Sequence, residues 1–167
     1  MRDQSSSLTA KPTRPSVIRE TTEGLAPKAL EVNVIFTNEQ ATAAALKAAG
    51  ALALDLGVCL RVRAAIVVPY ALPLDRPLVP IRFTEQLLSD IVCRSAEAAP
   101  ETTVHVYLCR DRLATLSQVL EPNSLVVIAG RDHWYPTAES RMAKALRSKG
   151  HRVVFIDVPK GTECDSQ

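Results

Sequence analysis

Five short apolar runs alternate with helical patterns along this chain, and the alternation constrains the fold more than any single residue. Connections between the runs are short, apart from one proline-rich segment. Such alternation predicts a parallel sheet with right-handed crossovers and helices on both faces. The sequence therefore predicts a doubly wound α/β domain. Its five predicted strands lie at residues 31–37, 58–68, 103–109, 124–130 and 152–158.

The four predicted helices are defined by their caps and their apolar faces. The first covers residues 39–56, where Thr37 and Gln40 have capping-box spacing and Gly57 suits the C-terminal end. Asp111 is a suitable cap for the short third helix. The predicted core-facing residues of the successive helices are Leu46, Ala49, Ala53 and Leu56; Phe83, Leu87, Leu88, Ile91 and Val92; Leu113, Leu116, Val119 and Leu120; and Met142, Ala145 and Leu146.

A proline-rich segment, residues 69–81, separates the second strand from the second helix. Its four prolines preclude a helix and disfavour a central strand. A loop of this length inside a compact domain often covers a site. We therefore expect an irregular segment that lies over a binding region.

Length and composition favour one folded domain with two tails. The chain has 167 residues, of which 47% are hydrophobic, so a core forms without a metal or a disulfide. We expect a flexible leader at residues 1–30, the α/β domain at residues 31–159 and a tail at residues 160–167. The longest charge-free stretch is too short to span a bilayer, and the start has no secretory pattern. A cytoplasmic protein without a membrane partner is expected.

The distribution of charge argues against nucleic acid as a partner. The formal net charge is +2, and the first 30 residues account for it, with five Lys or Arg against three Asp or Glu. The remaining domain is balanced and lacks the basic surface that nucleic acids require. The four cysteines show no metal-ligand spacing. Cys59 and Cys109 lie in apolar runs and are expected to serve as small hydrophobic residues.

Residues 31–159 resemble the universal stress protein (UspA-like) superfamily, which has an adenine nucleotide alpha hydrolase-like fold. The resemblance lies in the element order and in three runs: VNVIFTNEQATAAALKAAGALALDLGVCLRVRAAIVVP, LVVIAGR and RVVFIDV. It implies a Rossmann-like sheet of order 3-2-1-4-5, a role in the stress response, and a nucleotide site, when present, between the first and fourth strands. It also implies a homodimer through the fifth strand, Arg152 to Val158, because an apolar edge strand is a liability unless paired.

The residues at the nucleotide position depart from the pattern of that family. Relatives that bind ATP have an Asp where this chain has Thr37, followed by Asn38. They also carry a motif of G, two residues, G, nine residues, G and then Ser or Thr. Gly130 matches the first glycine and His133 stands at the second. The following loop is about five residues shorter than is usual in that family, and Ser140 after it supplies the final hydroxyl. A bulky side chain cannot form the backbone nest that holds a triphosphate. We expect no cofactor, ATP included, and a degenerate nucleotide site.

A polar cluster follows the fourth strand, and two interpretations of it stay open. Arg131, Asp132 and His133 are expected to lie near Thr37 and Asn38 and to bind a small anion at the switch point. Alternatively, Arg131 and Asp132 form a surface ion pair worth less than about 1 kcal/mol. The candidate ligand-binding residues are Thr37, Asn38, Gly130, Arg131, His133 and Ser140.

Other residues in or near this region have a structural interpretation beside a functional one. Glu139 is expected near the phosphate position, where its charge would repel an anion. Trp134 and Tyr135 either stack on a ligand or partner, or fold over the helix end. His105 is expected to face away from the neighbouring valines as a structural histidine, and His151 is expected to be exposed at the start of the fifth strand.

Three classes of function follow from these observations. The leading hypothesis is a regulatory or stress-response module that acts through association as a homodimer. The second is a small-molecule binding protein that takes a nucleotide or another anion in the altered site. An enzyme ranks last, because the sequence has no phosphate loop, no recognisable nucleophile and no metal cluster. A ligand screen separates the second class from the first.

Overall fold

The computed structural model describes residues 30–95, 101–131 and 133–159. The predicted leader, apart from Leu30, the predicted tail and Asp132 lie outside these residues. The described residues contain five strands and four helices in the predicted order. They are β1 (Glu31–Ile35), α1 (Glu39–Leu56), β2 (Cys59–Val67), α2 (Ile81–Ser95), β3 (Thr102–Cys109), α3 (Arg112–Val119), β4 (Leu125–Gly130), α4 (Ala138–Ser148) and β5 (Arg152–Asp157).

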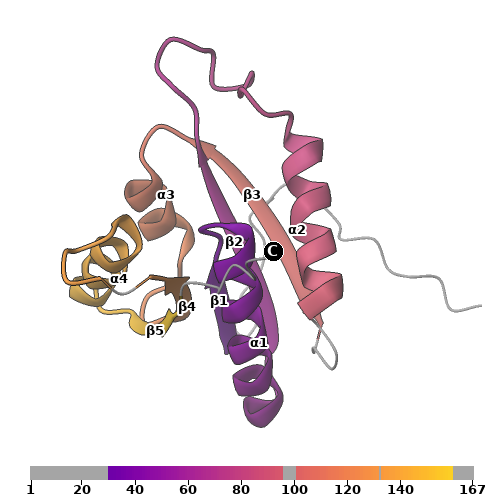
Figure 1. Cartoon of the computed structure of the whole chain (residues 1–167), viewed down its shortest axis with the longest axis vertical. Helices are drawn as coiled ribbons and strands as arrows, with labels where there is room; N and C mark the ends of the chain where they lie inside the picture. The colour runs from indigo at the N-terminus through magenta and orange to yellow at the C-terminus, as the bar shows by residue number, and fades with distance from the viewer. Residues whose placement is uncertain (1–29, 96–100, 132, 160–167) are drawn as a thin grey trace, which may run out of the picture.

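The five strands form one parallel sheet of order β3-β2-β1-β4-β5, as predicted (Figure 1). β1 lies in the centre, where Val34 pairs with Val62 of β2 and with Val127 of β4. From β1 the chain builds outward through β2 and β3 on one side, and through β4 and β5 on the other. The order therefore reverses between β1 and β4, and a crevice is expected where these two strands end.

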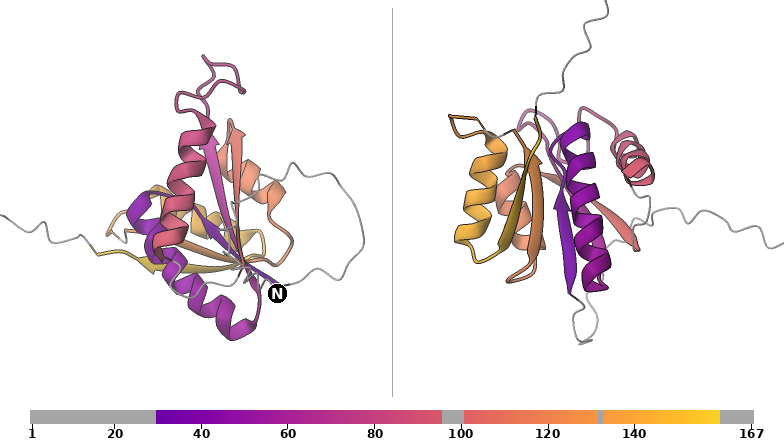
Figure 2. Two further views of the ribbon diagram at one scale, coloured as in Figure 1. Left: turned by 90° about the vertical axis from the view of Figure 1, so that its right-hand side faces the viewer. Right: turned by 60° about the horizontal axis from the view of Figure 1, so that its bottom comes forward.

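The helices cover both faces of the sheet, with α1 and α2 on one face and α3 and α4 on the other (Figure 2). Successive side chains of a strand point to opposite faces, so Val34 joins the core under α1 and α2, whereas Ile35 joins the core under α3 and α4. Both side chains are fully buried. Full burial of such a side chain stabilises a fold by about 1.5–3 kcal/mol. The two cores hold the sheet between the helix layers.

Helix α1 packs closely on the sheet because its buried face consists mainly of alanine. Ala45, Ala49 and Ala53 have no exposed surface. Gly57 ends the helix with φ 63°, and its N–H donates to the carbonyls of Ala53 and Leu54, as the sequence predicted. The prediction of Leu56 as a core residue is wrong, because Leu54, Asp55 and Leu56 at the end of the helix are all exposed.

The predicted core face of α2 is confirmed except at Phe83. Phe83 was expected to be buried, but it is 63% exposed. Leu88 and Ile91 are buried, as predicted, and Thr84 joins them in an i, i+4, i+7 series along one face. Leu87 and Val92 border this face and pack against the core in part. Phe83 precedes that series by one residue and therefore points away from the sheet.

The proline-rich segment between β2 and α2 has no helix or strand, as predicted, and it projects from the body of the molecule (Figure 1). Arg110 fixes its base by donating to the carbonyls of Val68, Pro69 and Leu72; the Val68 and Leu72 bonds are both 2.8 Å. The same guanidinium lies 5.1 Å from the ring centre of Tyr70. No residue of this segment lines the pocket described below.

The histidines outside the switch point differ in how well they were predicted. The His105 ring stacks on the Tyr107 ring with 6.3 Å between centroids, on the opposite face from Val104, as expected. His151 was predicted to be exposed, and this is wrong. It is 8% exposed, because Gly150 turns the chain at φ 91° and brings the His151 N–H to the Leu146 carbonyl. Burial, followed by the charge of Lys149, lowers the pKa of His151.

Candidate functional site

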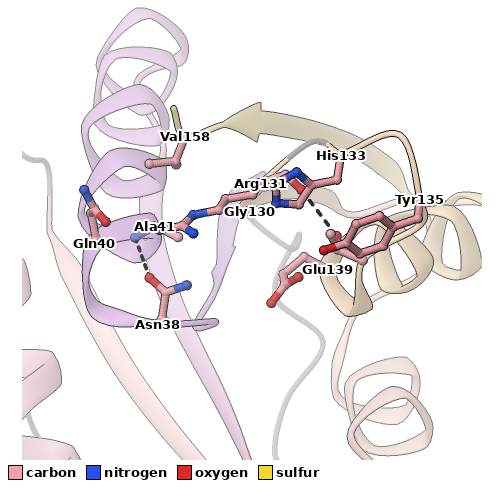
Figure 3. Close-up of a pocket in the computed structure, with 10 residues that line it drawn as sticks. Asn38, Gln40, Ala41, Gly130, Arg131, His133, Tyr135, Glu139 and Val158 are labelled. Atoms are coloured by element: carbon pink, nitrogen blue, oxygen red, sulfur yellow. Dashed lines mark hydrogen bonds between the residues drawn. The ribbon is translucent and has the colours of Figure 1, made fainter. Parts of the chain in front are cut away.

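A pocket of about 390 Å³ opens at the switch point, where β1 and β4 end (Figure 3). Residues from the start of α1 form one side of it, and residues between β4 and α4 form the other. A volume of this size falls within the range of small-molecule sites. The lining residues are Asn38, Gln40, Ala41, Gly130, Arg131, His133, Tyr135, Thr137, Glu139 and Val158.

The β1 side of the pocket is fixed by short polar contacts. Asn38 is the N-cap of α1, and its Oδ1 accepts a hydrogen bond of 2.9 Å from the Ala41 N–H. The Thr37 hydroxyl donates to the Ala129 carbonyl at 3.0 Å and ties β1 to β4. The Thr37 N–H donates to Thr42 Oγ1 at 3.3 Å. The predicted capping box of Thr37 and Gln40 is therefore wrong by one residue, because the Asn38 side chain is the one that caps α1.

The β4 side of the pocket depends on the absence of a side chain at Gly130. A Cβ atom at this position would lie 2.7 Å from the Glu139 Cβ and 3.3 Å from Cζ of Phe155. Glu139 lies in the first turn of α4, where an acidic side chain is stabilised by the helix dipole. Gly130 thus lies against Glu139, and α4 approaches the end of β4 closely. In this chain the space beside Gly130 holds protein atoms.

Thr137 begins α4 and belongs to the pocket wall. Its Oγ1 accepts a hydrogen bond of 3.2 Å from the Ser140 N–H, and its hydroxyl lies 3.4 Å from the Arg131 carbonyl. The cap thus connects the loop after β4 to the helix. Ser140 is half-buried in the first turn, and its N–H serves the cap. It does not line the pocket, so the structure does not bring this predicted residue to the site.

Two opposite charges line the pocket from different sides. Arg131 extends from the end of β4 toward the first turn of α1, and Glu139 projects from α4 (Figure 3). Within the described part of the chain, neither side chain makes a hydrogen bond or an ion pair, with the other or with any third residue. Arg131 is exposed and Glu139 is half-buried. Both charged groups are therefore available to a ligand.

Aromatic side chains form the outer rim of the pocket. The His133 and Tyr135 rings stack at 5.2 Å with an interplanar angle of 11°, and both residues line the pocket. Trp134 contacts Tyr135 edge-on but is 95% exposed and does not line the pocket. The sequence left open whether Trp134 and Tyr135 face a ligand or fold back. In the structure only Tyr135 faces the pocket.

The sequence predicted several residues of this pocket, but not those that only the tertiary structure brings to it. Asn38, Gly130, Arg131 and His133 line the pocket, as expected, whereas Thr37 and Ser140 do not. Six lining residues were not among the predicted ligand-binding residues, although Glu139 and Tyr135 had been considered as neighbours. Proximity to the helix starts would have indicated Gln40, Ala41 and Thr137, but no local signal marks Val158. The predicted Arg131–Asp132 pair lies partly outside the described residues.

The described part of the chain contains no group of three or more His, Cys, Asp or Glu residues placed to hold a metal ion. No helix within the described ranges is long and apolar enough to cross a bilayer. Cys59, Cys93 and Cys109 are free thiols; Cys109 is buried, as expected, and Cys59 is half-buried.

Comparison with known proteins finds similar solved structures. No family model matches the sequence, and no curated protein matches it. A universal stress protein from Archaeoglobus fulgidus superposes with a TM-score of 0.58 and 15% identity, over 77% of this chain and 93% of that chain. A universal stress protein in complex with cAMP superposes with a TM-score of 0.54 and 16% identity, over 79% of this chain and 100% of that one. The fold is therefore that of universal stress proteins, as the sequence resemblance implied.

Proposed function

We propose that this chain is a divergent universal stress protein that acts in regulation or the stress response by associating with a second copy of itself. Its nucleotide site is degenerate. The observation that carries the site argument is the close approach of Glu139 to Gly130, since the Cβ and Cγ atoms of a side chain stand beside the glycine where a phosphate needs bare backbone. The free thiols of Cys59, Cys93 and Cys109 are consistent with a reducing, cytoplasmic location.

The edge strand β5 is the surface through which we propose association. The N–H groups of Arg152 and Val158 donate to the β4-side carbonyls of Ser124 and Gly130, both at 2.9 Å. A parallel ladder uses the backbone of every second residue, so Val153, Phe155 and Asp157 direct their backbone groups to the open edge. The Val153 carbonyl accordingly accepts hydrogen bonds from the Arg147 side chain at 3.1 and 3.3 Å.

This alternation restricts how two copies of β5 pair. In an antiparallel pair, residues with outward backbone groups face one another. Pairing centred on Phe155 satisfies the rule: Phe155 faces Phe155 of the second copy, and Asp157 faces its Val153. Val154 and Ile156 then continue the core under α1, and the two Phe155 side chains meet on the α4 face. An apolar edge strand paired in this way no longer presents a surface for aggregation.

The test replaces Val153 with proline. Val153→Pro removes an outward N–H and leaves the bonds to β4 in place, since Pro is tolerated where the N–H faces away from the sheet. The matched control, Val153→Ala, also shortens the side chain but retains the N–H. Light scattering at micromolar concentration should show a dimer for the wild type and the control, and a monomer for the proline variant. A wild-type monomer would refute the proposed association.

A second candidate function is small-molecule binding in the pocket. It is favoured by one observation, the convergence of Asn38, Arg131 and His133 on a cavity of about 390 Å³. A ligand present at 100 times its dissociation constant stabilises a protein by about 2.7 kcal/mol, which a thermal shift detects. The screen should include nucleotides and acidic metabolites. A complete absence of shifts would remove this candidate and leave the dimer proposal intact.

A further inference from the structure

We infer that the switch-point pocket accepts a small zwitterion of the α-amino acid class, which carries a carboxylate and a primary ammonium group. The inference rests on the second candidate function, ligand binding in this pocket, and names the ligand chemistry. It starts from two charges of opposite sign that line one cavity, Arg131 and Glu139, neither of which has a partner among the residues that the structure describes.

The positions of the two charged side chains indicate which class of ligand fits the pocket. Arg131 reaches toward α1, whereas Glu139 stands on the α4 side of the pocket (Figure 3). Within the described residues they form no ion pair with each other, so neither neutralises the other. A ligand with one negative group would leave Glu139 without a partner, and a ligand with one positive group would do the same to Arg131. A zwitterion satisfies both, and charge-assisted hydrogen bonds are the strong ones.

The same geometry disfavours a nucleotide triphosphate. Its negative charges would lie near Glu139 at the start of α4, and like charges at close range repel. The Cβ and Cγ atoms of Glu139 lie close to Gly130, so the base of this side chain is held beside the end of β4. The stacked rings of His133 and Tyr135 supply an apolar wall for the side chain of an amino acid. L-Phenylalanine is therefore a suitable first probe.

The experiment compares L-phenylalanine with two analogues by titration calorimetry, using the full chain. Phenethylamine lacks the carboxylate, and 3-phenylpropionate lacks the ammonium group. We expect L-phenylalanine to bind at least about tenfold more tightly than either analogue, because each loses a hydrogen-bonded charge. A set of other aromatic and aliphatic L-amino acids is titrated in parallel.

Neutral variants assign each charge to its partner. Glu139→Gln should abolish the advantage of L-phenylalanine over 3-phenylpropionate but keep its advantage over phenethylamine. Arg131→Gln should produce the reverse pattern. Arg141→Gln removes an exposed cation of α4 that does not line the pocket, and it should leave all three affinities unchanged. A general loss of structure would weaken all ligands alike and cannot produce this exchange of preferences.

Three results would overturn the inference. One is equal binding of L-phenylalanine and both analogues. Another is the absence of saturable heat from every amino acid of the set at millimolar concentration. The third is saturable binding of ATP without binding of any amino acid, which would sustain ligand binding in the pocket while rejecting the zwitterion. Absence of binding by nucleotides, acidic metabolites and amino acids alike would reject the second candidate function as well.

Discussion

The two ends of strand β4 differ. The amino end follows a turn in which Ser124 makes several hydrogen bonds within the chain, whereas the carboxyl end opens into a pocket lined by two charged side chains that have no partner among the described residues. At its amino end, the Ser124 N–H and hydroxyl both donate to the Glu121 carbonyl, and the Ser124 carbonyl accepts from Arg152. At its carboxyl end, Arg131 and Glu139 have no partner within the described residues. The amino end of the strand thus serves to stabilise the fold, and the carboxyl end presents charged groups to a ligand.

The difference separates residues that stabilise the fold from residues that are free to bind. Around Gly130 both roles meet, because its missing side chain allows α4 to approach while its neighbours form the pocket wall. Side chains with internal partners, such as Thr37 and Asn38, hold the pocket in shape. We therefore expect substitutions of the supporting residues to change stability, and substitutions of Arg131 to change binding.

The largest effect is expected at the floor of the pocket. Gly130→Ala places a Cβ against Glu139, and overpacking of this kind destabilises a protein by about 1–3 kcal/mol. Urea unfolding measures the loss. In a Glu139→Gly background the same substitution should have a smaller effect, because the contacting side chain is gone.

Gly50 provides the matched control for that substitution. A Cβ at Gly50, inside α1, meets nothing within 4 Å. Gly50→Ala should therefore stabilise the protein by roughly 0.5–1 kcal/mol, since alanine is favoured over glycine within a helix. Equal destabilisation by both substitutions would contradict the account of the Gly130 contact.

A smaller effect is expected on the β1 side of the pocket. Asn38→Ala removes the cap of α1 and should lower the free energy of unfolding by about 1 kcal/mol. Asn38→Asp keeps the accepting oxygen and should retain most of the stability. If Thr37→Ala destabilised the protein while Asn38→Ala did not, the assignment of the cap would be wrong.

At the amino end of β4, the expected effect is a change in how the free energy of unfolding depends on pH. Burial and Lys149 lower the pKa of His151 from its ordinary value of 6.5, so the unfolded chain binds this proton more readily than the folded one. The stabilisation from a neutral His151 is complete above pH 6.5 and is lost as the pH falls through the folded pKa. His151→Leu should flatten the decline of the unfolding free energy between about pH 8 and about pH 5. An unchanged pH dependence would contradict the assignment.

The order of elements was predictable because periodicity and caps are local properties. The apolar run at residues 32–35 predicts a buried strand, and Gly57 predicts a helix end, without reference to tertiary contacts. Individual burial was less predictable. Phe83 and Thr84 are adjacent, and only the packing of α2 on the sheet decides which of the two is buried.

The pocket was predictable in place but not in content. Parallel strands that reverse order between β1 and β4 locate a crevice at their carboxyl ends. That Thr37 would bond Ala129, while Val158 would line the pocket, depends on side-chain directions across three strands. No spacing in the sequence encodes those directions.

Association through β5 is tested most directly by hydrogen exchange of its individual amides at increasing protein concentration. Pairing centred on Phe155 predicts slower exchange for Val153, Phe155 and Asp157 as the dimer forms. The amides of Arg152 and Val158, which already donate to carbonyls on the β4 side, should change little. If light scattering detects a dimer while the three outward amides exchange as fast as in the monomer, the chains associate elsewhere and the account is contradicted.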